Sequence, residues 1–300
     1  MKQRISVLAT AALASVFLTV QPLQAQQYPT KPVRYVVAFA AGDSPDIVAR
    51  LVGDKLSRMW DQQVLVENRT GAGGTIAGNF VAKSAPDGYT LFHCNIASNG
   101  IAPGLYVKLP YDGLRDFSPI SRIGTTPNAL NVHPSMPVRT LKEFVAHAKA
   151  TPGKISYGHG GVGASPALTD LLGGQIPVMI SNVPALLPYV QSGKIRPLAV
   201  TSPKRVAPLP SIPTFIESGY PTFEVTSWYG LCGPAGVPAP VLDKVHGDLL
   251  KVLQMPDVVQ RFTDMVVEPA PQSREEFTGY IRSEMARWAK VVKDAGIPLQ

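Results

Sequence analysis

The sequence predicts an α/β protein built around a parallel sheet. From Tyr28 onward, segments with the pattern of strands alternate with segments of helical periodicity, which is typical of that class. The first strand-like run, residues 33–39 (VRYVVAF), is almost continuously apolar, as expected of a strand buried on both faces. Two strand–helix–strand units follow one another at the start, and such units place their strands parallel in one sheet.

The first of these units is the most clearly marked. After the strand at 33–39, apolar residues recur at helical spacing from Ile47 to Met59. Ser44 is predicted to cap this helix and Pro45 to occupy its first position. The remaining elements of this part are a strand at 64–67, a helix at 76–83 and a strand at 90–94.

The rest of the chain repeats the alternation. Thr140 and Glu143 form a capping box for a helix at 141–150, and Ser273 and Glu276 form another for the last helix. Between these helices we predict strands at 154–158, 176–180, 196–201 and 224–234, and helices at 166–172, 185–191 and 241–253.

Residues 1–25 have the pattern of a secretory signal peptide. Lys2 and Arg4 precede an apolar run at 5–20, and a short polar break ends at Ala25, where we expect cleavage. The remaining chain has no apolar stretch long enough to span a bilayer and no cysteine placed for a lipid anchor. The mature protein, about 275 residues, is therefore expected to be soluble and exported, with one large or two ordinary domains.

The net charge indicates which kinds of partner to expect, and the two cysteines raise the question of a disulfide. The formal net charge is +7, and loss of Lys2 and Arg4 would lower it by two. The charges are scattered, so we predict a mild bias toward anionic partners and no nucleic-acid partner. Cys94 and Cys232 both lie in apolar, strand-like segments. We favour two small buried side chains over a disulfide, which an exported chain would allow.

The turn between the first strand and its helix predicts an anion site. A helix that begins directly after a strand leaves backbone N–H groups unpaired and carries about half a positive charge at that end. Such an end binds a carboxylate or phosphate without a cationic side chain. Gly42 would allow close approach of a ligand there. The alternative is that Ser44 and Asp46 only cap the helix and that the turn is solvated.

Other motifs predict no chemistry. The glycines at 71, 73, 74 and 78 lack the spacing of a dinucleotide loop, so a tight turn and close helix packing explain them better. The five histidines are isolated, which disfavours a metal site. His159, in a glycine-rich loop after the strand at 154–158, is the one histidine that we consider a candidate for binding. No G-x-S-x-G segment supports a hydrolase.

Several segments together resemble one known family over essentially the whole mature chain. They are 28–42 (YPTKPVRYVVAFAAG), 66–74 (VENRTGAGG), 85–91 (APDGYTL), 109–120, 166–176, 194–205 and 224–241. In this order they resemble the Bug (TctC) family of extracytoplasmic solute-binding proteins, which serve tripartite tricarboxylate transporters. VENRTGAGG and APDGYTL are the most specific of these segments.

The resemblance implies a type II periplasmic-binding-protein fold, in which two α/β domains joined by a two-strand hinge close on a small organic carboxylate. Residues 26–125 and 228–300 would form the first domain, and residues 126–227 the second. The binding residues that it implies are Ala40, Ala41, Gly42, Asp43, Ser44, Asp46, Asn95, Ala97, Ser98, Asn99, His159, Gly160 and Asn182.

The resemblance also implies a periplasmic monomer that is not an enzyme. Such a protein has no cofactor, no metal ion and no catalytic residue, and it delivers its ligand to the membrane permease subunits of the transporter. Alternatives are a ligand-sensing partner of a membrane sensor, a secreted hydrolase, and a truncated relative that has lost binding.

This chain departs from the family pattern in two places. Relatives usually carry glycine where Asp43 stands, and an exposed carboxylate there would repel an anionic ligand by about 1 kcal/mol. Asp43 therefore either turns outward or accepts an ammonium group. Between the glycine-rich loop and the helix at 166–172, about 25 residues are missing, the size of one helix–strand crossover. Loss of an interior strand would expose two sheet edges, so we expect the second domain either to re-pair its strands or to become partly disordered. We also expect it to bind more weakly or differently.

Overall fold

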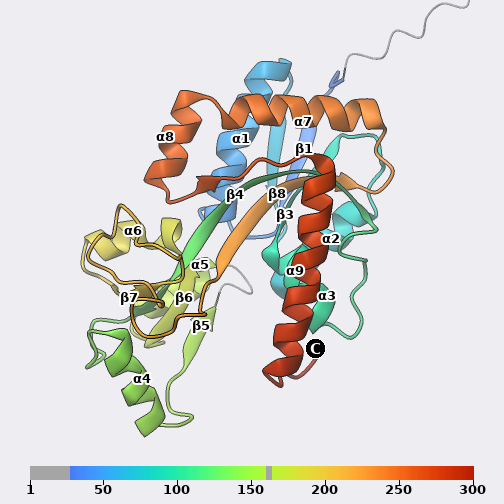
Figure 1. The fold of residues 1–300 in the computed structure, drawn as a ribbon. Helices are drawn as coiled ribbons and strands as arrows, with labels where there is room; N and C mark the ends of the chain where they lie inside the picture. The colour runs from blue at the N-terminus through green and yellow to red at the C-terminus, as the bar shows by residue number, and fades with distance from the viewer. Residues whose placement is uncertain (1–27, 160–163) are drawn as a thin grey trace, which may run out of the picture.

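The computed structural model describes residues 28–159 and 164–300 and shows two lobes on one curved mixed sheet (Figure 1). The strand order is β2-β1-β3-β8-β4-β6-β5, and β7 and β9 also pair with β4. The strands are β1 (Val33–Val37), β2 (Val64–Asn68), β3 (Thr90–Asn95), β4 (Phe117–Val132), β5 (Tyr157–His159), β6 (Val178–Asn182), β7 (Arg196–Val200), β8 (Thr226–Pro234) and β9 (Glu268–Pro269). The predicted signal peptide lies outside the described residues.

Helices cover both faces of the sheet. They are α1 (Ser44–Trp60), α2 (Thr75–Ala82), α3 (Ala102–Leu105), α4 (Leu141–Ala150), α5 (Ala164–Leu172), α6 (Val183–Gln191), α7 (Ala239–Leu253), α8 (Pro256–Asp264) and α9 (Arg274–Asp294). A 3₁₀ turn, η1 (Ala72–Gly74), precedes α2, and a π-helix, η2 (Ile96–Ile101), follows β3.

We call β1–β3 with α1–α3 and α7–α9 the first lobe. Its strands β2, β1 and β3 are parallel, as the strand–helix–strand pattern predicts. The apolar face of α1, including Val48, Val52 and Leu56, is fully buried against Tyr35 and Val37 of β1. The α/β class predicted from the sequence is confirmed.

We call β5–β7 with α4–α6 the second lobe. Its core contains Leu171 of α5, Met179 of β6 and Leu186 of α6. Strands β5 and β6 pair in parallel, with Tyr157 opposite Val178 and His159 opposite Ile180.

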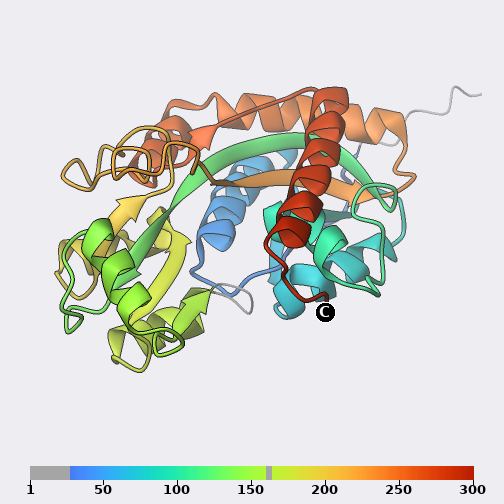
Figure 2. The ribbon, with the colours of Figure 1, turned by 60° about the horizontal axis from the view of Figure 1, so that its bottom comes forward.

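Strands β4 and β8 connect the lobes, and Figure 2 shows them arching across the molecule. They pair antiparallel from Phe117 opposite Pro234 to Pro127 opposite Thr226. From Asn128 onward β4 pairs instead with β6 and, from Ala129, with β7 of the second lobe. These are the two segments that we predict as the hinge; the domain boundaries stay a prediction.

The second lobe pairs its remaining strands with each other, which is one of the two expected outcomes. In the first lobe the second strand along the chain, β2, lies at the edge, outside β1. The corresponding place in the second lobe is outside β5, so β5 pairs directly with β6 and itself forms the edge of the sheet.

Local sequence signals were mostly correct. The hydroxyls of Thr140 and Ser273 accept hydrogen bonds from the backbone N–H of Glu143 and Glu276. The prediction of Ser44 as the cap of α1 is wrong by one residue, because Asp43 takes the extended N-cap conformation and Ser44 is the first helical residue.

The glycine cluster serves backbone geometry and packing, as predicted. Gly73 and Gly74 have φ values of 63° and 92°, which favour glycine. A Cβ atom on Gly78 would lie 2.7 Å from the ring of Tyr111. The side chain of any other residue would therefore push α2 away from Tyr111.

Cys94 and Cys232 form a disulfide, so our preference for two unpaired cysteines is wrong. They are 138 residues apart, and only the antiparallel pairing of β3 with β8 brings their Cα atoms to 5.9 Å. Both residues are fully buried. The bond ties the first lobe to one of the two connecting strands.

Replacing both cysteines by alanine should lower the free energy of unfolding by about 2–4 kcal/mol, because the cross-link restricts the unfolded chain. Denaturant unfolding at neutral pH measures the difference. Chemically reduced wild-type protein is the matched control and should be as unstable as the variant. Equal stability of oxidised wild type and variant would contradict the prediction.

Candidate functional site

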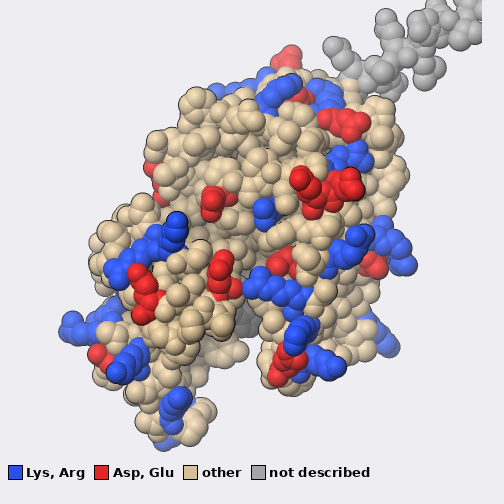
Figure 3. Space-filling view, viewed as in Figure 1, with Lys and Arg blue, Asp and Glu red and all other residues tan. Residues whose placement is uncertain are grey.

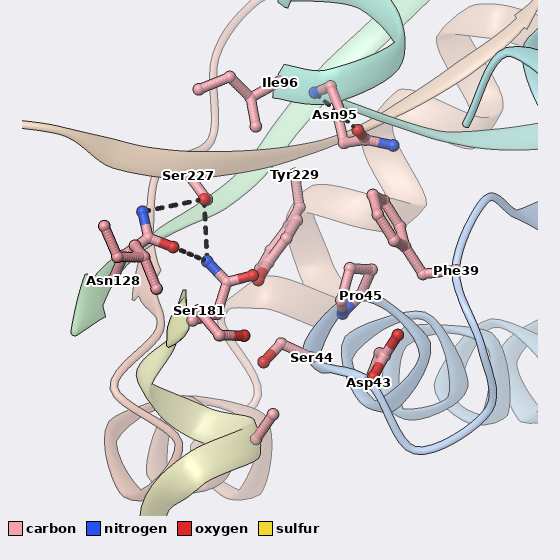
Figure 4. Close-up of a pocket in the computed structure, with 14 residues that line it drawn as sticks. Phe39, Asp43, Ser44, Pro45, Asn95, Ile96, Asn128, Ser181, Ser227 and Tyr229 are labelled. Atoms are coloured by element: carbon pink, nitrogen blue, oxygen red, sulfur yellow. Dashed lines mark hydrogen bonds between the residues drawn. The ribbon is translucent and has the colours of Figure 1, made fainter. Parts of the chain in front are cut away.

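A pocket of about 160 Å³ lies between the two lobes, beside β4 and β8 (Figure 4). It is bounded by the starts of α1 and η2 in the first lobe, by the end of β6 and the start of α6 in the second, and by the connecting strands. The lining residues are Phe39, Asp43, Ser44, Pro45, Asn95, Ile96, Ala97, Asn128, Ile180, Ser181, Asn182, Ala185, Ser227 and Tyr229.

Some of the residues predicted from sequence line this pocket and others do not. Those that line it are Asp43, Ser44, Asn95, Ala97 and Asn182. Those outside the lining are Ala40, Ala41, Gly42, Asp46, Ser98 and Asn99. The backbone of His159 ends β5, while its side chain and Gly160 lie outside the described residues.

Gly42 and Asp46 shape the turn before α1 instead of facing the pocket. The Asp46 carboxylate accepts hydrogen bonds from the Gly42 amide (2.9 Å), from Arg50 (2.9 Å) and from Asn68 (2.8 Å). Burial alone would raise the pKa of Asp46, but these hydrogen bonds outweigh it and hold the pKa below its usual value. The Gly42 amide therefore already has an acceptor within the turn.

The start of α1 still presents an open donor. The Ser44 amide donates no hydrogen bond within the described part of the chain, and Pro45 has no N–H to donate. Asp43 is 3 % exposed and lines the pocket, so the alternative that it turns outward is wrong. The positive end of the α1 dipole therefore faces the pocket with at least one unpaired amide.

Two buried hydroxyls lie at the same place. Ser44 Oγ and Tyr229 Oη have no hydrogen-bond partner among the described residues, although both are shielded from solvent. Burial raises the pKa of Tyr229 far above its usual range, the nearby Ser44 hydroxyl lowers it by less, and the Asp43 carboxylate raises it slightly further. The phenol stays protonated and can donate a hydrogen bond.

His93 is a further buried polar residue and lies beside Tyr229. The ring of His93 lies 5.3 Å from that of Tyr229, and His93 Nδ1 shares a hydrogen bond of 2.7 Å with the hydroxyl of Tyr35. His93 is fully buried, which lowers its pKa to about 3 and keeps it neutral at ordinary pH. The His93 side chain therefore adds no charge next to Tyr229.

Sequence analysis missed the residues that the connecting strands supply. Asn182 Nδ2 donates to Asn128 Oδ1 (2.9 Å) and to Ser227 Oγ (2.8 Å), so these three side chains join β4, β6 and β8 on the pocket side. Asn182 was among the residues that the family resemblance implied, whereas Asn128 and Ser227 are polar residues within strands and were not singled out. Only the pairing of the strands shows that they share a face.

The π-helix η2 was also unexpected. Asn95 caps it, since Asn95 Oδ1 accepts hydrogen bonds from the amides of Ala97 (2.9 Å) and Ser98 (3.2 Å). The Ser98 hydroxyl donates to Asn99 Oδ1, and Asn99 Nδ2 donates to the Gly113 carbonyl, all in the protein interior. Asn95 therefore positions the pocket wall at Ile96 and Ala97.

The pocket is polar without being cationic. None of its 14 described lining residues is Lys or Arg, and residues 160–163 are Gly-Gly-Val-Gly. Apolar side chains, including Ile96 and Ile180, form part of the wall.

On the outer surface, Figure 3 shows charges of both signs interspersed over the visible face, without a continuous basic patch.

Comparison with known proteins establishes the class and the family. The fold is that of periplasmic binding proteins. A family model described as "Tripartite tricarboxylate transporter family receptor" matches residues 48–169 and 162–297. The chain therefore belongs to this TctC family, whose members are periplasmic solute-binding receptors.

Individual relatives match over nearly their full length. Protein BugT of Bordetella pertussis is 32% identical, with 98% of this chain and 96% of BugT covered. The structure described as "R. palustris Rpa4515 with adipate" has a TM-score of 0.87 and 31% identity, covering 91% of this chain and all of that one. "MatC (Rpa3494) from Rhodopseudomonas palustris with bound malate" has a TM-score of 0.85 and 29% identity over 88% and 100% of the two chains.

The alignments also bear on the shortened second lobe. The BugT alignment extends over 320 residues, more than the 300 of this chain. The two segments matched by the family model overlap at 162–169, which includes the start of α5, next to the place where the sequence predicts the missing unit. In the part of the chain that the structure describes, no helix is long and apolar enough to cross a bilayer.

Acid should destabilise this protein through His93. Its folded pKa of about 3 lies below the usual 6.5, so the unfolded chain binds the proton first, and stability is lost as pH falls from 6.5 toward 3. Between pH 6.5 and 5 we expect a loss of about 2 kcal/mol from this group, at about 1.4 kcal/mol per pH unit. Denaturant unfolding at both pH values should show this loss in the wild type and not in His93→Gln. An equal loss in both proteins would rule out His93 as the cause.

Proposed function

We propose that this protein is a periplasmic receptor that captures a small organic carboxylate between its lobes and passes it to a tripartite tricarboxylate-type membrane transporter. The observation that carries the proposal is the pair of buried, unpaired hydroxyls of Ser44 and Tyr229 beside the open end of α1. A carboxylate bound there would accept both hydrogen bonds and the Ser44 amide, and it would remove the cost of leaving buried donors unpaired.

The rest of the lining fits the carbon chain of such a ligand. Ile96 and Ile180 offer apolar contacts from opposite lobes, and the Ser181 and Ser227 hydroxyls add polar contacts near the second lobe. Relatives with adipate and with malate support a carboxylate of this size. Because contacts come from both lobes, a ligand would favour an arrangement in which the lobes close on it.

Recognition would use neutral donors and a helix dipole, because the described lining contains no cation.

The family supports a receptor rather than an enzyme, and the transporter that the family serves supports permease subunits as partners. The chain's signal-peptide pattern supports cleavage and export to the periplasm. A ligand-sensing role would use the same pocket, and no observation favours it.

The shortened second lobe keeps its share of the pocket. Ile180, Ser181, Asn182 and Ala185 all belong to that lobe and line the cavity. This supports retained binding over the alternative of a truncated relative that has lost it.

A thermal-shift screen of mono-, di- and tricarboxylates on the mature protein tests the proposal. At a ligand concentration 100 times the Kd, binding should stabilise the protein by about 2.7 kcal/mol, visible as a rise in Tm. Calorimetric titration of each hit gives the Kd. The matching alcohols and amides are the controls. If no carboxylate raises the Tm or gives heat of binding, the proposal is wrong.

The two hydroxyls should matter separately. Tyr229→Phe and Ser44→Ala should each weaken binding of a hit from the screen about 10-fold to 100-fold, because each removes a hydrogen bond to a charged group. Both should fold, since neither hydroxyl has a partner among the described residues. Tyr220→Phe, at an exposed tyrosine outside the pocket lining, is the matched control. Unchanged affinity in both pocket variants would place the carboxylate elsewhere.

A further inference from the structure

A second hollow lies behind the connecting strands. This back groove, of about 410 Å³, is lined by residues 202–208 of the loop after β7 in the second lobe and by Thr263 and residues 266–269 of the first lobe. Thr125 and Pro127 of β4 and Thr226 of β8 complete it. Like the ligand pocket, it is bounded by both lobes.

The back groove and the pocket lie on opposite faces of the same two strands. On β4, Pro127 lines the groove and the next residue, Asn128, lines the pocket. On β8, Thr226 lines the groove and Ser227 lines the pocket. Successive side chains of a strand point to opposite faces. A rotation of the lobes about these strands that narrows the pocket must therefore widen the groove.

Val266 lines the back groove and contacts the opposite lobe. Its neighbours Met265 and Val267 are buried in the core of the first lobe, whereas Val266 packs against the core of the second lobe, which includes Val206 and Leu209. Val206 also lines the groove. In Figure 1, α8 and the loop after β7 lie next to each other at this place.

The backbone of Val266 is strained at this contact. Its φ is 55°, in the left-handed region, which a β-branched residue rarely adopts. The buried Thr126 hydroxyl of β4 donates a hydrogen bond of 2.9 Å to the Val266 carbonyl. Strained residues of this kind persist where the surrounding structure fixes them, often at functional places.

We infer that Val266 is a latch that opposes closure of the lobes and so sets ligand affinity without touching the ligand. The contact of Val266 with the second lobe is strongest when the groove is narrow and the pocket wide. Closure widens the groove and loses this contact. The free energy of ligand binding must therefore offset the loss of the Val266 contact. A substitution that removes this contact favours the closed arrangement.

This inference rests on the proposed function and adds how the same site is regulated. Val266→Ala should lower the Kd of adipate about threefold to tenfold, because substitutions away from a site change such couplings to this extent. Val259→Ala, at an exposed valine of α8, is the matched control and should leave the Kd unchanged. Isothermal titration calorimetry measures both.

A second readout needs no ligand. Spin labels on cysteines introduced at the exposed Lys83 of the first lobe and Lys142 of the second report the interlobe distance, since both native cysteines are in the disulfide. Val266→Ala should shift the distance distribution of the free protein, and Val259→Ala should not. If Val266→Ala changes neither the distances nor the Kd, the latch is disproved while binding by the wild type still supports the proposed function. If the wild type does not bind adipate, the distances alone decide the inference and the carboxylate screen decides the function.

Discussion

The antiparallel pairing of β4 with β8 is the constraint on which the rest of this structure depends. It is the one part of the sheet that belongs to both lobes, since β4 goes on to pair with β6 and β7. Because side chains alternate along a strand, the same pairing creates a polar face with Asn128 and Ser227 and a groove face with Pro127 and Thr226. The disulfide anchors β8 to β3 of the first lobe. The pocket and the back groove therefore both follow from one ladder of hydrogen bonds.

The chemistry of the pocket follows from backbone geometry more than from charged side chains. The turn before α1 is held by Asp46, which takes up the Gly42 amide and leaves the Ser44 amide open. Neutral donors and a helix dipole can hold a carboxylate without the desolvation free energy that burying a cation would cost. His93 and Tyr35, which share a hydrogen bond beside Tyr229, add no charge to the site.

The shortened second lobe shows why the place of a deletion in the sheet matters more than its length. A strand removed from the middle would have left two unpaired edges. Here the first lobe, with β2 outside β1, shows that the corresponding place lies at the edge. The sheet therefore ends one strand earlier, at β5, and the residues of β6 and α6 that line the pocket keep their positions.

Local periodicity, capping and backbone preference were enough to predict four features: the α/β class, the capping boxes at Thr140 and Ser273, the role of the glycines near Gly78 and the strand–turn–helix at residues 33–60. Its resemblance to a known family supplied the two-lobed fold and part of the pocket lining. Only the tertiary structure decided the pairing of Cys94 with Cys232, the joint placement of Asn128, Asn182 and Ser227, and the contact of Val266 with the opposite lobe. Each of these depends on which strands or lobes are neighbours, and residues far apart in the chain carry no local signal of that.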